Sequence, residues 1–277
     1  MRSPARGPGA GLAILLALVA TAAAAPLLTP FDPLAIDTTH VYEPPGPRHP
    51  FGTDGLGRDV LARVLYGGRA TLGAGAIATA LAFGLGALLG TLAGHRGGWL
   101  DVLASRAADV VLAFPLLVAA LAILGLAPAR DPAGQAARIG VVIGAFAWPA
   151  IFRLVRAEAS RLRTGEAVLA ARALGCGELR VAVVHLLPRA VLPALAPAAF
   201  VASAAVLTEA GLSFLGLGVR PPAASWGSLL REASEAVTRA WWLAAFPGLF
   251  LYLTTVGCQL AGERLRAGLT GRGTAGP

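Results

Sequence analysis

The chain has 277 residues, of which 56% are hydrophobic and 14% charged, and its formal net charge is +8. A soluble domain carries about 25% charged residues, so this composition excludes an ordinary soluble protein and favours an integral membrane protein. Strand-like alternation of apolar and polar residues is absent, which excludes a membrane barrel and predicts an all-α fold. All 23 basic residues are arginine, so the chain has no P-loop of the Gly-Lys-Ser/Thr type for ATP.

Long uncharged runs predict six transmembrane helices. Each run is near the ~20 residues that a helix needs to cross a bilayer. The fourth run has an uncharged core of 14 residues, so this span must borrow its flanks or pack inside the bundle. The six runs are residues 7–31, 70–94, 110–129, 139–152, 190–208 and 240–262.

The first run also fits a cleavable signal peptide, because Arg2 and Arg6 precede it and "ATAAAAP" ends it. A retained anchor is favoured, since the uncharged stretch is longer than a usual signal core. The expected organisation is an N-terminal segment with the first helix (1–31), an outer loop (32–69), a five-helix core (70–262) and a cytoplasmic tail (263–277).

Arginine placement predicts that both termini are cytoplasmic. With the N-terminus inside, the inner segments hold 14 arginines and six acidic residues, whereas the outer segments hold nine of each. Basic residues near span ends favour the cytoplasmic side, so the net positive charge requires no nucleic-acid partner. The inner arginines are Arg2, Arg6, Arg96, Arg106, Arg153, Arg156, Arg161, Arg163, Arg172, Arg180, Arg189, Arg264, Arg266 and Arg272.

The outer loop contains "FGTDGLGRDVLARVLYGGRATL". Val60, Leu61, Val64 and Leu65 recur at helical spacing and predict an amphipathic helix against the membrane or the bundle. The preceding glycines suit a compact turn, although a loop that merely caps the helices would have the same composition. The candidate residues of this outer loop motif are Gly52, Thr53, Asp54, Gly57, Arg58 and Asp59.

Small residues and prolines shape the expected bundle. Gly86, Gly90 and Gly94 recur every four residues in the second span and predict a face where another helix packs closely. Proline disrupts helical hydrogen bonding, so three prolines in or beside spans are expected to bend their helices. They are Pro115, Pro149 and Pro247.

A polar inner segment, residues 153–188, separates the fourth and fifth runs. "GEAVLAARALG" predicts a helix stopped by Gly175 in a C-terminal capping position, and "ELRVAVVHLL" predicts a second helix ending before Pro188. Two short helices at an angle form a protruding knuckle, a shape suited to docking into a partner's groove.

The same segment resembles the cytoplasmic coupling loop of ABC importer permeases. The pattern Ala-Ala, three residues, Gly, nine residues, then x-x-Leu-Pro is present, with Leu169 where the family often has Glu. The resemblance implies an ATPase-coupling helix loop between the fourth and fifth transmembrane helices. Its candidate residues are Ala170, Ala171, Arg172, Gly175, His185, Leu187 and Pro188.

Further blocks narrow the resemblance to the second permease subunit of the dipeptide/oligopeptide/nickel family. They are "GTDGLGRDVLARVLYGGRATL", "GHRGGWLDVLASRAADVVLAFP", "HLLP" and "LTEAGLSFLGLGVRPPAASWGSLL". The resemblance places Trp226 and Gly227 near the outer mouth of the path, although Trp226, like Trp241 and Trp242, also fits an interfacial anchor.

This resemblance implies a non-catalytic subunit in a bacterial plasma (inner) membrane, forming half of the path for a small solute. Peptides are favoured, with nickel complexes possible. The implied partners are a sister permease, two cytoplasmic ABC ATPases that bind ATP and Mg, an extracytoplasmic substrate-binding protein and membrane lipid. No cofactor or metal is expected in this chain.

Two other classes of membrane protein fit the sequence less well. An intramembrane hydrolase needs a base beside its nucleophile, and no histidine is expected near Ser213. An ion-coupled secondary transporter usually carries ionisable groups inside its spans, and the predicted span interiors have none. Glu209 lies just past the fifth run, either buried or exposed. Cys176 and Cys258 are expected to be small apolar fillers, because their spacing fits neither a zinc site nor a disulfide.

Overall fold

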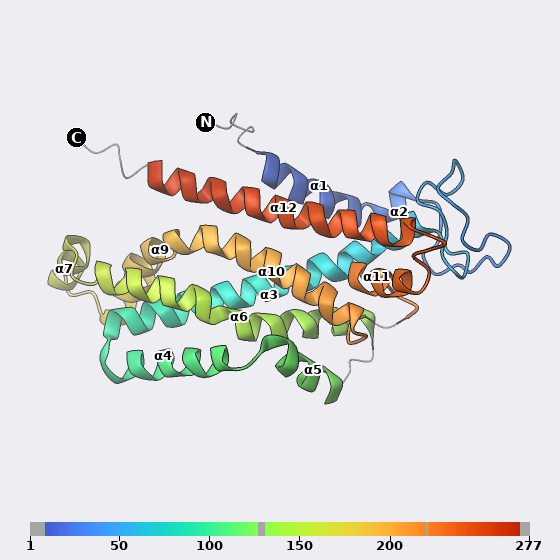
Figure 1. Ribbon diagram of the computed structural model, residues 1–277. Helices are drawn as coiled ribbons and strands as arrows, with labels where there is room; N and C mark the ends of the chain where they lie inside the picture. Colours follow the sequence, from blue (N-terminus) through green and yellow to red (C-terminus); the bar gives the residue numbers. More distant parts are fainter. Residues whose placement is uncertain (1–8, 127–130, 220, 272–277) are drawn as a thin grey trace, which may run out of the picture.

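The computed structural model describes residues 9–126, 131–219 and 221–271. Within these ranges the chain is helical apart from turns, loops and one isolated bridge between Thr53 and Asp59, which confirms the all-α prediction. The long helices run side by side in an elongated bundle (Figure 1). Its main helices are α1 (Ala10–Ala23), α2 (Ala25–Leu28), α3 (Val60–Arg96), α4 (Gly98–Ala113), α5 (Leu116–Leu126), α6 (Pro132–Leu162), α10 (Leu195–Phe214), α11 (Trp226–Ser234) and α12 (Trp242–Gly271).

Four of the described helices are long and apolar enough to cross a membrane: α3, α6, α12, and α10 with the short turn before it. The pair α4 and α5 is long and apolar enough when taken together, but it bends by 84° at Pro115, as predicted for that proline. At 14 residues, α1 is shorter than a span. The described helices therefore provide four to five spans where six were predicted.

The predicted division between an amphipathic helix and the second span does not occur. α3 is one helix of 37 residues that begins at Val60, where the Asp59 side chain accepts a hydrogen bond from the Ala62 N–H at 2.7 Å. Arg63 and Arg69 interrupt the uncharged run, but Arg63 is buried, and the exposed Arg69 donates its Nε to the Ala22 carbonyl at 2.8 Å. The boundary predicted at residues 69–70 thus falls within a helix.

Glycines allow α3 and α6 to pack closely, as predicted for the second span. A Cβ added at Gly86 would lie 2.7 Å from Ile151 Cβ, and one at Gly94 would lie 2.5 Å from the Arg156 carbonyl oxygen. Gly140 on α6 approaches the Ala74 carbonyl of α3 in the same way. Such backbone approach favours helix association where lipid removes the hydrophobic driving force. α6 extends beyond both ends of the short uncharged run 139–152 to a length of 31 residues, as expected for the fourth span.

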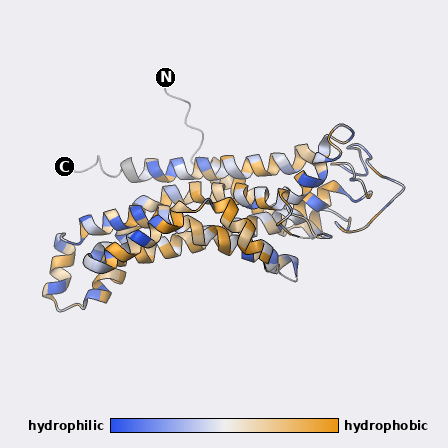
Figure 2. Cartoon of the chain, turned by 60° about the horizontal axis from the view of Figure 1, so that its bottom comes forward, coloured by the Kyte–Doolittle hydropathy of each residue, from blue (hydrophilic) through white to orange (hydrophobic). Residues whose placement is uncertain are grey.

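The two ends of the bundle differ in structure. Residues 163–190 project from the end of the bundle at which α12 ends, whereas the loop of residues 29–59 and α11 lie at the other end (Figure 1). Apolar residues dominate the middle of the bundle, and hydrophilic residues concentrate toward its ends (Figure 2). Arg2, Arg6 and Arg272, which contribute to the predicted inner charge, lie outside the described residues.

Candidate functional site

The segment between α6 and α10 forms a projecting unit, here named the knuckle and defined as residues 163–190. It contains α7 (Glu166–Ala173), α8 (Glu178–Arg180), a π-helical turn (Val181–Leu186) and α9 (Leu187–Ala190). Its apolar side packs on the neighbouring spans in a cluster that includes Val168, Ala171, Val181 and Leu186 together with Ile151 and Val155 of α6. The knuckle is therefore a packed structure continuous with the bundle.

The turn that follows α7 is closed by backbone hydrogen bonds. The Gly175 N–H donates to the Arg172 carbonyl at 2.9 Å, and the Cys176 N–H donates to the Ala171 carbonyl at 3.0 Å, a Schellman motif. Gly175 has a φ of +79°, a left-handed conformation that costs other residues about 1–2 kcal/mol. The prediction that Gly175 ends this helix is confirmed.

The predicted end of the second helix, before Pro188, is wrong. The helical backbone passes through the π-helical turn and continues as α9 to Ala190. Proline lacks an N–H but is tolerated in the first turn of a helix, and the change from π to α geometry places Pro188 in that first turn. The knuckle therefore runs on toward α10 with only short interruptions.

The sequence-predicted residues of the knuckle divide between its packed and exposed sides. Ala171 is buried, with 5% of its surface exposed, and anchors α7 on the bundle. His185 and Leu187 are half-buried, and His185 lines a hollow of about 380 Å³ with Glu166. The exposed members are Ala170, Arg172, Gly175 and Pro188.

The knuckle also carries an apolar surface that the sequence pattern did not single out. Leu174, in the turn itself, is 85% exposed, and Leu179, at the start of the second helix, is 63% exposed. Large exposed apolar groups gathered on a projecting, otherwise polar segment are typical of protein interaction sites. The exposed apolar residues of the knuckle are Leu169, Leu174, Leu179, Val183 and Val184.

A polar junction joins the knuckle to the end of α3. Arg172 of α7 donates two hydrogen bonds to the Glu178 carboxylate, at 2.9 and 3.0 Å. His95, in the last turn of α3, places its Nε2 2.7 Å from Glu178 Oε2. The Arg172 hydrogen bonds lower the pKa of Glu178, and the same bonds raise the pKa of Arg172. Arg172, predicted as a partner contact, is therefore bound within its own chain.

At the other end of the bundle, the outer loop motif is built into a compact cap. Thr53 accepts a hydrogen bond from the Glu43 N–H at 2.8 Å, and its carbonyl accepts one from Trp242 Nε1 at 3.0 Å. Gly57 has a φ of +71°, and a Cβ there would lie 1.7 Å from the Asp37 carbonyl oxygen. Of the three glycines predicted to form the turn, Gly52 also takes positive φ, at +72°, whereas Gly55 does not. The motif thus forms the turn that starts α3.

A buried ion cluster ties this cap to α11. Asp54 accepts hydrogen bonds from Arg58 Nε at 2.7 Å and from an Arg63 guanidinium nitrogen at 2.6 Å. Arg63, only 2% exposed, also donates two hydrogen bonds to Glu232 of α11, at 2.5 and 2.9 Å. Asp59, another member of the predicted motif, lies next to this cluster, and its carboxylate is 2.8 Å from His49 Nδ1. The sequence pattern missed Arg63 and Glu232, which lie 169 residues apart.

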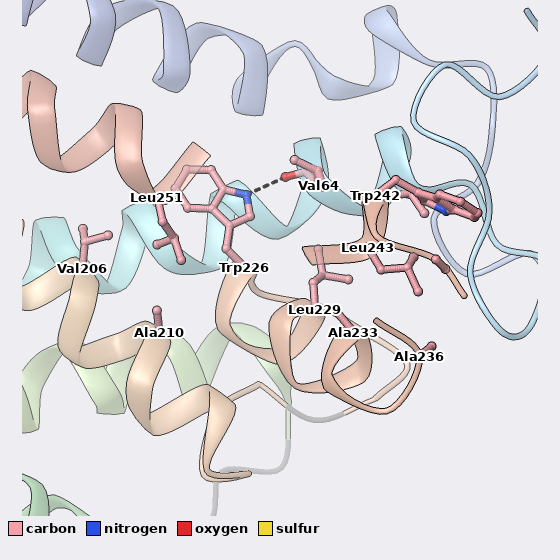
Figure 3. Packing of buried hydrophobic residues seen from close by; sticks show 12 residues of the cluster. Val64, Val206, Ala210, Trp226, Leu229, Ala233, Ala236, Trp242, Leu243 and Leu251 are labelled. Atoms are coloured by element: carbon pink, nitrogen blue, oxygen red, sulfur yellow. Dashed lines mark hydrogen bonds between the residues drawn. The ribbon is translucent and has the colours of Figure 1, made fainter. Parts of the chain in front are cut away.

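Trp226 and Gly227 lie at a packing joint. Trp226 is 1% exposed, and its indole Nε1 donates to the Val64 carbonyl of α3 at 2.8 Å, as Figure 3 shows. A Cβ at Gly227 would lie 2.3 Å from the Ala210 carbonyl oxygen of α10. These contacts exclude the interfacial-anchor alternative for Trp226 and make α11 a plug fitted between α3 and α10.

Glu209 is an ionisable side chain inside a span, contrary to the prediction that the span interiors have none. α10 continues to Phe214, beyond the expected end at 208, and Glu209 is 1% exposed. One carboxylate oxygen accepts a hydrogen bond from Ser213 Oγ at 2.6 Å. Within the described ranges no three His, Cys, Asp or Glu side chains gather as a metal site would require.

Comparison with known proteins identifies a family and several relatives. The family described as "Binding-protein-dependent transport system inner membrane component" matches residues 86–266. The chain is 37% identical over 259 residues to a putative peptide transport system permease protein of Brucella suis biovar 1, covering 92% of this chain and 84% of the relative. It is 36% identical over 259 residues to a dipeptide transport system permease protein of Alkalihalophilus pseudofirmus, covering 94% and 84%.

Proposed function

The chain belongs to the family of binding-protein-dependent transport system inner membrane components, and from this membership we propose that it forms one half of the path of an ATP-driven peptide importer. The chain is an ABC importer permease, the membrane component of a transport system. Its relatives are named for peptide and dipeptide transport, which favours peptides as the solute over nickel complexes.

The proposed topology has six spans in a bacterial inner membrane, with both termini in the cytoplasm. It counts the bent pair α4 and α5 as the third span and α1 with α2 as the first. Residues 10–28 would reach ~28 Å as a continuous helix, and α1 packs along α12 closely enough that a Cβ at Gly11 would lie 2.6 Å from the Ala261 amide nitrogen. The arginine bias of the sequence supports a cytoplasmic position for the knuckle.

The knuckle is the proposed contact for one of two cytoplasmic ABC ATPases, the other of which would bind the sister permease. The observation that carries this proposal is the apolar surface around Leu174 on a turn fixed by the Schellman motif. An ATPase dimer that closes on ATP and Mg would draw two such knuckles together. Because the knuckle continues into α6 and α10, its displacement would tilt them, a rigid-body switch between inward and outward access.

A sister permease and a binding protein complete the proposed assembly. One subunit supplies half of a path, so the described helices need a related partner in lipid. The cap of residues 52–59 and α11, with Trp226 and Gly227, would face the extracytoplasmic side. This end is proposed to receive the substrate-binding protein, which delivers the peptide.

Replacing Gly175 with Ala is expected to weaken ATPase docking about 5–30-fold, the effect of 1–2 kcal/mol. The positive φ at Gly175 is unfavourable for alanine, so the turn reorganises and Leu174 moves. Gly177→Ala is the matched control, because Gly177 has a φ of −64° and open space around its Cβ position. The measurement is co-purification of the ATPases with each variant, co-expressed with the sister permease.

Equal ATPase recovery with both variants would remove this turn from the docking contact. Absence of any ATPase with the wild-type chain, in a properly paired permease, would instead favour the ion-coupled secondary transporter. The buried Glu209 suits that alternative, and transport driven by an ion gradient without ATPase would establish it.

A further inference from the structure

His95 joins three separate elements through a single carboxylate. Its side chain is 1% exposed, and its Nε2 lies 2.7 Å from Glu178 Oε2 at the start of α8. The same carboxylate accepts both hydrogen bonds from Arg172 of α7. The end of α3 and both short helices of the knuckle therefore meet at Glu178.

The surroundings of His95 favour this junction. Histidine in the last turn of a helix interacts favourably with the carbonyl end of the helix dipole, and more so when protonated. Gly94 lets the end of α3 lie against α6, where Ser160 Oγ donates to the Gly94 carbonyl at 3.3 Å. The His95 ring, which follows Gly94, is almost fully buried, and its Nε2 edge reaches Glu178. By contrast, the Arg161–Glu158 pair lies within α6 alone, with Arg161 68% exposed.

α3 carries a charged junction at each end. A helix of 37 residues extends ~55 Å. At its first turn Arg63 binds Asp54 of the cap and Glu232 of α11. At its last turn His95 contacts Glu178 of the knuckle. One continuous helix thus connects the segment that would bind the ATPase with the helix that closes the opposite end.

We propose that His95 is a positioning residue that fixes the knuckle to α3, so that a displacement of the knuckle is delivered to α3 as well as to α6 and α10. The inference rests on the proposed function, because it assigns a route for the motion that the ATPases would impose. The knuckle is linked to α6 and α10 by the backbone, and to α6 also by the apolar cluster that includes Val168 and Val181. The π-helical turn and α9 also pack against α3, and the His95 contact adds a polar link between α8 and the end of α3. Without that link, α7 and α8 can shift while α3 and the attached α11 stay in place.

The test compares His95→Leu, His95→Gln and Glu178→Ala in the complete complex of both permeases, ATPases and binding protein, reconstituted in liposomes. The readout is peptide transported per ATP hydrolysed, with ATPase recovery measured in the same preparations. His95→Leu and Glu178→Ala are each expected to lower this ratio at least about fivefold, the lower end of typical coupling between sites. His95→Gln retains a side-chain donor toward Glu178 and is expected to keep the ratio within about twofold of wild type.

A double-mutant cycle makes the result specific to the contact. The double variant of His95→Leu with Glu178→Ala is expected to match Glu178→Ala alone, because Glu178→Ala already removes the His95 contact together with the two Arg172 hydrogen bonds. Arg161→Ala and Glu158→Ala, which break a pair confined to α6, are expected to leave the ratio unchanged. A wild-type ratio in His95→Leu, or additive losses in the double variant, would overturn the proposal while the ATPases remain docked.

Folding defects are separated by two further observations. Glu178 is 53% exposed, so Glu178→Ala tests the contact without disturbing a buried position. If its ratio is normal the proposal fails, whatever His95→Leu does to assembly. If the wild-type complex recovers no ATPase at all, the proposed function fails instead, and the two failures are thereby distinguished.

Discussion

Replacing Gly86 with leucine is expected to prevent the normal packing of α3 on α6. A Cβ at this position would lie 2.7 Å from Ile151 Cβ and 2.9 Å from the Phe152 amide nitrogen, so the two backbones must separate to admit the larger side chain. Overpacking a close contact costs about 1–3 kcal/mol and occasionally more. The upper value lowers Tm by about 6–12 °C in a chain of this size, which thermal unfolding of the purified subunit in detergent will measure.

Gly84→Leu is the matched control for this prediction. Gly84 lies two residues earlier on the same helix, and no atom lies within 4 Å of its Cβ position. Replacing a mid-helix glycine also improves helix propensity, so its Tm is expected to stay level or rise slightly. Measurement on the isolated subunit keeps a sister permease from contacting either side chain. Equal losses in the two variants would mean that glycine on this helix serves flexibility, and the close α3–α6 approach would then have no part in stability.

The features predicted correctly from sequence depend on local spacing. Glycines four residues apart lie on one face of any helix, so the packing face containing Gly86, Gly90 and Gly94 could be foreseen without its partner. The end of α7 at Gly175 was equally local, because a Schellman turn is specified within six residues. The bend at Pro115 follows from the chemistry of proline itself.

The features that failed depend on partners far away in the chain. Arg63 interrupts the uncharged run, so hydropathy alone could not extend the span back to Val60. Its charge is satisfied by Asp54 and by Glu232, which is 169 residues away. The predicted fifth span excludes Glu209 for a similar reason, since Ser213 satisfies one of its oxygens only when both residues lie on the same continued helix. A one-dimensional scan treats every charge as exposed.

The sequence predicts where the knuckle lies in the chain, but it does not predict which residues the knuckle contacts or exposes. Ala171 and Gly175 lie where a coupling turn needs them, one packed and one at the bend. The exposed Leu174 and the junction at His95 were missed. Leucine exposure depends on which side of the turn faces the bundle, and the His95 contact joins residues that are distant in sequence. A search for apolar residues flanking the turn could have found the first, but no local signal marks the second.

Arg63→Met is expected to destabilise the subunit by about 3 kcal/mol, near the lower end of the cost of breaking a buried ion pair. Methionine fills similar volume but leaves Asp54 and Glu232 with Arg58 as their remaining cationic partner. Asp54 is 4% exposed, so water compensates it poorly. The measurements are Tm of the detergent-solubilised subunit and hydrogen exchange of the α11 amides, which should accelerate because α11 loses its attachment to α3.

Glu232→Gln tests the exposed part of this ion cluster separately from its buried part. Glu232 is 37% exposed and the amide retains an acceptor oxygen, so its loss is expected to stay within about 1 kcal/mol, as for exposed pairs. An Arg63→Met subunit as stable as wild type would mean that Asp54 is satisfied by Arg58 and by the backbone N–H groups of Leu56 and Arg58 alone. α11 would then be held mainly by Trp226 between α3 and α10, and the outer junction of α3 would be apolar in origin.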